Sequence, residues 1–74
     1  MNKTHAKLYF ESFEDKQSFV EDFFTLSHEK TCFLELEYSS TKLEIQVHLT
    51  GIPSKELLRQ LEKIYGKELN FFNS

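Results

Sequence analysis

The chain has 74 residues, of which 28% are charged and 39% hydrophobic, and its formal net charge at pH 7 is −3. A chain this short cannot divide its apolar residues between two cores, so we expect a single domain over residues 1–74. Charges of both signs argue against a disordered segment, and the negative balance argues against a basic nucleic-acid binder.

The cysteine content indicates the compartment. Cys32 is the only cysteine, which excludes an internal disulfide and any CxxC motif. No basic segment followed by a long apolar run opens the chain, and this pattern predicts neither a signal peptide nor a membrane span. We therefore expect a cytoplasmic protein.

The first predicted elements are a strand and a helix. Residues 5–11 alternate apolar and polar side chains, and a period of two predicts a half-buried strand. Ser12 resembles the start of a capping box, with Asp15 where glutamate is usual. The apolar residues beyond it fall within an arc of about 160° on a helical wheel. They predict an amphipathic helix that ends near Ser27 and His28 and uses Phe13, Phe19, Val20, Phe23, Phe24 and Leu26 as its apolar face.

Two strands are predicted in the middle of the chain, at residues 32–38 and 43–49. The four polar residues between them suit a hairpin. Both strands alternate, so each has one apolar and one polar face. The apolar faces consist of Cys32, Leu34, Leu36 and Tyr38 in the first strand and of Leu43, Ile45, Val47 and Leu49 in the second.

The last third of the chain predicts a second helix and a short strand. Gly51 and Pro53 break the preceding strand, and Ser54 is a suitable N-cap. Gly66 stands where a left-handed C-cap is expected. Residues 67–72 predict a fourth strand at an edge of the sheet. Between Ser54 and Gly66 the apolar side chains fall within an arc of about 120° on a helical wheel. They are Leu57, Leu58, Leu61, Ile64 and Tyr65.

The resulting order, β-α-β-β-α-β, predicts an α+β fold of the ferredoxin-like type. Right-handed crossovers would place both helices on one face of a four-stranded antiparallel sheet with strand order 4-1-3-2. An alternative is a β-α-β-β-α domain whose last residues pair with a second chain.

The sheet face turned away from the helices is the predicted binding surface. Aromatic side chains within a charged rim are typical of protein-binding hot spots, and an acidic field attracts a partner rich in Lys and Arg. The other interpretation is a solvated face that keeps the protein soluble and its edges unpaired. The face is expected to carry two lysines, Lys7 and Lys42, against five glutamates, Glu11, Glu35, Glu37, Glu44 and Glu68. The predicted partner-binding residues are Tyr9, Glu11, Phe33, Glu35, Glu37, Glu44, His48 and Phe72.

Several functions that such a sheet can support lack their motifs here. An RNA-recognition motif needs aromatics on both central strands and a Gly-aromatic string, whereas these strands offer only Tyr9. The CxxC of heavy-metal transport domains and the glycine-rich phosphate cradle of acylphosphatases are missing as well. We therefore expect no enzyme and no cofactor, and nucleic acid is disfavoured as a partner.

A zinc site is the remaining alternative that involves specific chemistry. His5, His28 and His48 are predicted at one end of the fold, and with Glu29 they could ligate zinc. No short-range ligand spacing supports this cluster, so the favoured interpretation is no metal site, with His5 in a frayed terminus and His28 near a helix end. Cys32 is expected to be a small buried side chain.

Taken as a whole, the pattern favours a small acidic cytosolic protein that binds a basic surface of a larger protein as an inhibitor, adaptor or antagonist. Mimicry of nucleic-acid charge toward a nucleic-acid-handling partner is a narrower version of the same hypothesis. The alternative is a homodimeric structural or regulatory subunit without catalytic activity, because small size and exposed aromatics both favour dimerisation.

Overall fold

A computed structural model describes residues 2–26 and 30–73 of the chain. The elements follow the predicted order, and the α+β class is confirmed. They are β1 (Lys3–Tyr9), α1 (Phe13–Phe23), β2 (Cys32–Tyr38), β3 (Glu44–Gly51), α2 (Lys55–Tyr65) and β4 (Phe72–Asn73).

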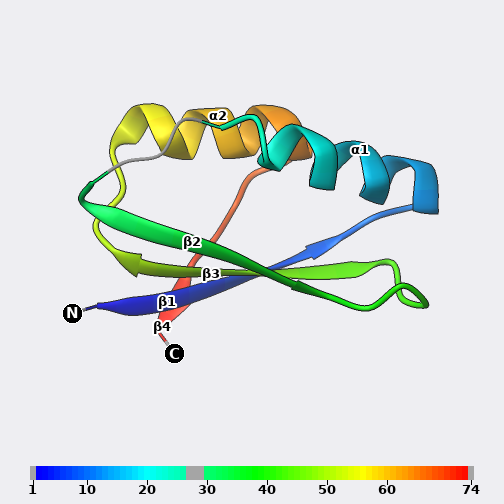
Figure 1. The fold of residues 1–74 in the computed structure, drawn as a ribbon, viewed down its shortest axis with the longest axis horizontal. Coiled ribbons are helices and arrows are strands. Elements are labelled where there is room, and N and C mark those ends of the chain that lie inside the picture. The colour runs from blue at the N-terminus through cyan, green and yellow to red at the C-terminus, as the bar shows by residue number, and fades with distance from the viewer. Residues whose placement is uncertain (1, 27–29, 74) are drawn as a thin grey trace.

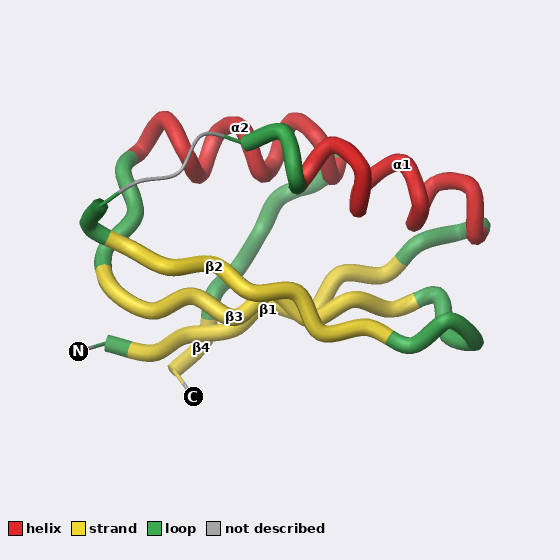
Figure 2. The backbone as a smooth tube through the Cα atoms, in the orientation of Figure 1, coloured by secondary structure: helices red, strands yellow, loops and turns green. Residues whose placement is uncertain are grey.

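The strands form one antiparallel sheet in the order β2-β3-β1-β4. This is the predicted order read from the opposite edge, so the predicted topology of the strands is confirmed. Both helices lie on one side of the sheet and leave its other side uncovered (Figures 1 and 2). β4 pairs with β1 of the same chain, through Thr4 with Asn73 and His5 with Phe72. The alternative in which the last residues pair with a second chain is therefore not the arrangement observed.

The hydrophobic core lies between the sheet and the two helices. Its centre consists of side chains from the two central strands and from α1, and the most completely buried ones include Leu8, Ile45 and Phe19. The alternation of β1 and β3 dictates this arrangement, because every second side chain of each strand faces the helices. The buried hydrophobic residues are Ala6, Leu8, Phe19, Val20, Ile45, Val47, Leu49, Leu57 and Leu61.

The predicted helix caps are confirmed. The Ser12 hydroxyl accepts a hydrogen bond of 3.1 Å from the Asp15 N–H at the start of α1, and the Ser54 hydroxyl accepts one of 3.1 Å from the Leu57 N–H at the start of α2. Gly66 ends α2 in the left-handed conformation with φ +80°. The cap residues therefore set the start of both helices and the end of α2.

The first helix ends earlier than predicted, at Phe23 rather than near Ser27 and His28. The Thr25 hydroxyl donates to the Asp22 carbonyl at 2.7 Å, and the Thr25 N–H donates to the same oxygen at 3.0 Å. These bonds replace the next turn of the helix with a tighter one. Phe24 therefore lies beyond the helix and is exposed, although its spacing predicted a buried position.

The boundaries of three strands also differ from those predicted. β1 covers Lys3–Tyr9 instead of residues 5–11, and β3 continues to Gly51, where the Gly51 N–H donates to the Asn2 carbonyl at 2.9 Å. β4 is reduced to two residues, because the Leu69 N–H donates to a carboxylate oxygen of Glu62 at 3.0 Å and this bond holds the preceding segment against α2.

Candidate functional site

The open face is the side of the sheet that neither helix covers. Antiparallel pairing places directly opposed side chains on the same face, so the register shows which residues are neighbours there. One row crosses all four strands: Glu35 lies opposite His48, His48 opposite His5, and His5 opposite Phe72. The open face consists of Lys3, His5, Lys7 and Tyr9 on β1, Phe33, Glu35 and Glu37 on β2, Glu44, Gln46, His48 and Thr50 on β3, and Phe72 on β4.

Rings occupy the middle of this row. The ring centroids of His5 and His48 are 6.4 Å apart, and those of His5 and Phe72 are 6.5 Å apart. The predicted sharing of one face by His5 and His48 is confirmed, and the prediction that His5 lies in a frayed terminus is wrong, because His5 is inside β1 and pairs on both sides.

The open face is less acidic than predicted, because two of the five expected glutamates are not on a strand. Glu11 follows the end of β1 at Tyr9, and Glu68 precedes the start of β4 at Phe72. The carboxylates that remain on the strands are those of Glu35, Glu37 and Glu44. The strand lysines of this face are Lys3 and Lys7, and both lie on β1. On the strands the charges are therefore segregated, with carboxylates on β2 and β3 and ammonium groups on β1. Lys42, predicted on this face, instead lies in the β2–β3 loop, next to the acidic part.

A contact between two side chains connects β2 and β3 within this acidic part. Nε2 of His48 lies 3.1 Å from a carboxylate oxygen of Glu37, although Glu37 is paired in register with Gln46. Both side chains are partly exposed, so the contact adds little to stability. In the structure it directs the Glu37 carboxylate toward β3, and a contact this weak leaves the carboxylate able to turn to another partner.

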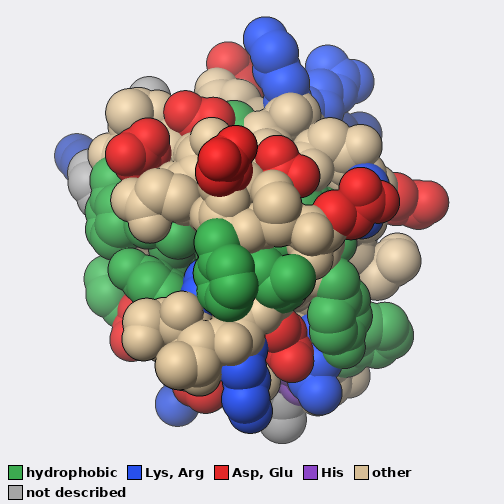
Figure 3. All heavy atoms as spheres, turned by 90° about the vertical axis from the view of Figure 1, so that its right-hand side faces the viewer, with side chains coloured by type: hydrophobic (Ala, Val, Ile, Leu, Met, Phe, Trp, Pro, Cys, Tyr) green, Lys and Arg blue, Asp and Glu red, His purple; other side chains and the backbone are tan. Residues whose placement is uncertain are grey.

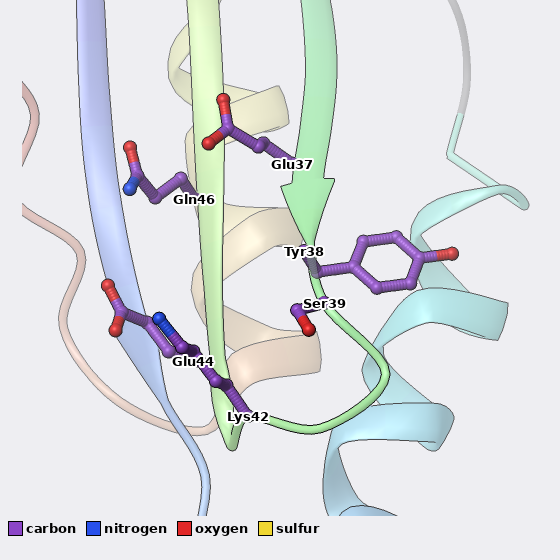
Figure 4. A pocket seen from close by; sticks show the side chains of 6 residues that line it. All are labelled: Glu37, Tyr38, Ser39, Lys42, Glu44 and Gln46. Carbon is purple, nitrogen blue, oxygen red and sulfur yellow. The ribbon is translucent and has the colours of Figure 1, made fainter.

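A polar hollow of about 230 Å³ lies where the acidic part meets the β2–β3 loop. Figure 4 shows its lining: Glu37, Gln46 and Glu44 project from neighbouring strands, while Tyr38 points away from them toward α1. This volume is below the range typical of small-molecule sites. The hollow therefore suits the end of a single side chain rather than a substrate.

Three aromatic side chains of the open face have most of their surface exposed. Tyr9 is 56% exposed, Phe33 61% and Phe72 62%. Phe33 is on β2 and Phe72 on β4, which are the two outer strands, as predicted. Apolar rings in these positions are covered only when another molecule docks on the face.

No family model matches this chain, and no curated protein or solved structure shows significant similarity to it.

The chain's chemistry must therefore be inferred from its own geometry. Among residues 2–26 and 30–73, no group of three or more His, Cys, Asp or Glu side chains is arranged to hold a metal ion. The alternative of a zinc site also involves His28 and Glu29, which lie outside the described residues. Neither helix of the described part is long and apolar enough to cross a membrane. Cys32, expected to be buried, is half-buried at the start of β2.

The sequence patterns did not identify Lys16 as an important residue, but in the structure its side chain is only 5% exposed. Its Nζ donates to the backbone carbonyls of Ser39 and Lys42, the latter at 2.7 Å. The same nitrogen lies 5.7 Å from the ring centre of Phe13 and 5.4 Å from that of Tyr38. These distances are within the range of cation–π contacts.

The spacing of Lys16 along the helix does indicate in the sequence that its side chain is buried. It stands three and four residues before Phe19 and Val20, so its stem must lie on the buried face of α1. Figure 3 looks onto this end of the molecule, where hydrophobic side chains gather in a band between the helices and the sheet. The ammonium group of Lys16 therefore ties the β2–β3 loop to α1 and supports the adjoining end of the open face.

Proposed function

We propose that this protein is a small binding module that occupies a surface of a larger protein through its open face, as an inhibitor, adaptor or antagonist. We further propose that its architecture is the ferredoxin-like sandwich, that it acts in the cytoplasm and that it has no catalytic activity. The observation that carries this proposal is the exposure of Tyr9, Phe33 and Phe72 on a sheet face that also presents three carboxylates.

The chemistry of the partner follows from the segregated charges. Glu35, Glu37 and Glu44 favour a partner with Lys or Arg opposite β2 and β3, and charge complementarity also speeds association. Exposed aromatic rings beside them would supply the apolar contact that most strongly stabilises interfaces. Three strand carboxylates give weaker support to mimicry of nucleic-acid charge than five would, so a basic protein surface is the better-supported partner.

The proposal is tested by capture with a charge-reversed variant. Immobilised protein is compared with Glu35→Lys combined with Glu44→Lys, and bound proteins are identified by mass spectrometry. The matched control is Glu56→Lys combined with Glu68→Lys, which changes the net charge equally on and after α2. We expect the open-face variant to lose a specific partner that the control retains. Capture that is equal for all three proteins would refute the proposal.

A homodimer is the second candidate, and the segregation of charge favours it. If two copies stacked face to face with their sheets rotated, the carboxylates of β2 and β3 in one would meet Lys3 and Lys7 in the other. The same contact would cover Phe33 and Phe72. Light scattering after size-exclusion chromatography decides between the candidates, because a monomer at every concentration rules out the dimer.

A further inference from the structure

The two edges of the sheet are protected to very different extents. The edge formed by β4 is two residues long, and beyond it the Tyr9 N–H of β1 donates to the Tyr65 hydroxyl at 3.0 Å. β2, at the other edge, has seven residues and pairs with β3 along its whole length without a bulge. Its segment, CFLELEY, contains neither proline, glycine nor lysine, which are residues that commonly prevent pairing at an edge.

The backbone groups that point outward from β2 follow from the hydrogen bonds of β3. The N–H groups of Phe10 and Gly51 bond across the β1–β3 pair, to the carbonyls of Leu43 and Asn2. Odd-numbered residues of β3 therefore bond to β1, and even-numbered ones bond to β2. Glu35 and Glu37 lie opposite His48 and Gln46, so their backbone groups face β3.

It follows that the backbone N–H and C=O groups of Leu34 and Leu36 point away from the sheet. Within the part of the chain that the structure describes, no strand lies beside them. In Figure 1, β2 runs in front of the other strands, and its front side is not covered by another strand. An added strand that continued the antiparallel pairing of this sheet would bond to these groups with the alternation of an antiparallel ladder.

The side chains of β2 give an added strand a definite chemistry on each face. On the helix side, Leu34 and Leu36 are only half-buried, and Tyr38 is exposed. On the open side, the only ionisable side chains of β2 are those of Glu35 and Glu37. In an antiparallel ladder these glutamates would occupy non-hydrogen-bonded positions, where opposing side chains lie closest together.

A second copy of β2 is a poor occupant of this edge. In the antiparallel register that overlaps all seven residues, Glu35 would lie directly opposite the same residue of the other copy. In the next register, shifted toward the C-terminal end of β2, Glu35 of each copy lies opposite Glu37 of the other copy. Like charges directly opposite each other destabilise a sheet. In these two registers the glutamates oppose self-pairing, and they attract a strand of opposite charge.

We infer that the outer edge of β2 binds an extended segment of the partner protein, which joins the sheet as an added antiparallel strand. The segment alternates basic residues, which face Glu35 and Glu37, with apolar residues, which cover Leu34 and Leu36. This inference rests on the proposed function, because it specifies how a basic partner would be bound.

Short synthetic peptides test the inference with the intact protein. The parent peptide alternates lysine with valine, and a second peptide has glutamate in place of lysine. In an added antiparallel strand the valine N–H groups bond to β2 and the lysine N–H groups point outward, so N-methylated versions separate the two sets. Affinity is measured by fluorescence anisotropy, and hydrogen exchange of the Leu34 and Leu36 amides reports the site.

We expect the parent peptide to bind and to slow exchange at Leu34 and Leu36. N-methylation of the valines should weaken binding about tenfold, since net hydrogen bonds are lost, whereas N-methylation of the lysines should change it less than about twofold. The glutamate peptide should bind about tenfold more weakly than the parent, because two attractive pairs become repulsive. Glu35→Lys combined with Glu37→Lys should reverse this preference, and Glu56→Lys combined with Glu68→Lys should not.

Two results would overturn the inference. The first is a parent peptide that does not bind, and the second is an N-methyl-valine peptide that binds as well as the parent. Either result leaves the proposed function standing if partner capture is still lost in the Glu35→Lys, Glu44→Lys variant, because the partner would then contact side chains of the open face alone. If capture is also insensitive to that variant, both proposals fail.

Discussion

At the scale of single residues, Lys16 has the most specific structural role. A lysine in the apolar face of a helix would ordinarily be unfavourable, because burying an ammonium group without partners is costly. Here two backbone carbonyls of the β2–β3 loop accept its protons, and two rings lie within cation–π distance. The loop therefore depends on a side chain that comes from the other layer of the fold.

We predict that Lys16→Met lowers the free energy of unfolding by about 2 kcal/mol, which is the typical strength of a hydrogen bond to a charged group. Methionine keeps most of the buried length of the side chain but donates no hydrogen bond to Ser39 or Lys42. Urea denaturation measures the change, and faster hydrogen exchange in residues 39–42 should accompany it. Lys63→Met, at an exposed position of α2, serves as the control and should change stability by less than about 0.5 kcal/mol. Equal stability of the two variants would contradict the assigned role.

The two glycines differ in how much space surrounds them. Both have positive φ, +97° at Gly51 and +80° at Gly66. A Cβ atom at Gly51 would overlap the Thr31 carbonyl oxygen and lie 3.1 Å from the Cα of Cys32, whereas a Cβ at Gly66 would meet nothing within 4 Å. Gly51 is therefore required for the close approach of β3 to the start of β2, in addition to its conformation.

From this difference we predict that Gly66→Ala costs about 1–2 kcal/mol, the strain of a left-handed residue with a side chain. Gly51→Ala should cost distinctly more, because the steric overlap is added to the same strain. Chemical denaturation of both variants measures the difference, and Gly66→Asn should be milder than Gly66→Ala. A smaller loss in Gly51→Ala than in Gly66→Ala would show that the contact with Thr31 is not tight.

At the scale of the elements, Tyr65 connects the end of α2 to the end of β1. Its hydroxyl accepts from the Tyr9 N–H at 3.0 Å and donates to the Tyr9 carbonyl at 3.3 Å. Its ring packs edge-on against Phe10 and Phe19, with centroids 5.5 Å and 6.2 Å away. One side chain thus fixes α2 over the sheet and satisfies the backbone of β1 where β4 does not reach.

We therefore expect Tyr65→Phe to destabilise the fold by about 1 kcal/mol, since the ring contacts remain and only the hydrogen bonds are lost. Hydrogen exchange at the Tyr9 amide, measured by NMR, should become faster. Tyr38→Phe is the control, because among the described residues the Tyr38 hydroxyl has no hydrogen-bond partner. If the Tyr9 amide exchanges equally fast in Tyr65→Phe and in the unmodified protein, the hydroxyl does not protect this edge.

At the scale of the whole molecule, the distribution of charge matters more than the net charge of −3. Carboxylates lie on β2 and β3, and the lysines of the open face lie on β1. We predict that the association rate with a basic partner falls several-fold as NaCl rises, because the screening length shrinks from about 10 Å at 0.1 M to about 3 Å at 1 M. Stopped-flow measurements with the lysine-valine peptide test this, and the dissociation rate should change much less. A salt-independent association rate would mean that the acidic part does not steer binding.

Local patterns predicted most of the fold. Period-two alternation identified the strands and the buried faces of β1 and β3, and Ser12, Ser54 and Gly66 marked helix ends that the structure confirms. Such signals are local, because a capping serine acts within one turn of its own helix. Right-handed connections then restricted the strand order to the one observed.

The predicted binding residues were harder to place, because their position depends on where strands end. Phe33, Glu35, Glu37, Glu44 and His48 lie on the open face as expected, as do Tyr9 and Phe72. Glu11 does not, since β1 ends two residues earlier. The alternating pattern continues through Glu11 in the sequence, but a strand ends where the neighbouring strand no longer pairs with its backbone.

The sequence by itself determined the class of fold, the order of its elements, the caps and most of the residues that share a face, because hydrophobic periodicity and capping are properties of neighbouring residues. Only the tertiary structure decided that Lys16 bonds to the β2–β3 loop, that Glu62 holds the last segment away from the sheet, and that the acidic and basic groups of the strands occupy different strands. These features depend on contacts between distant residues, whose distances and hydrogen bonds are set when the helices pack on the sheet.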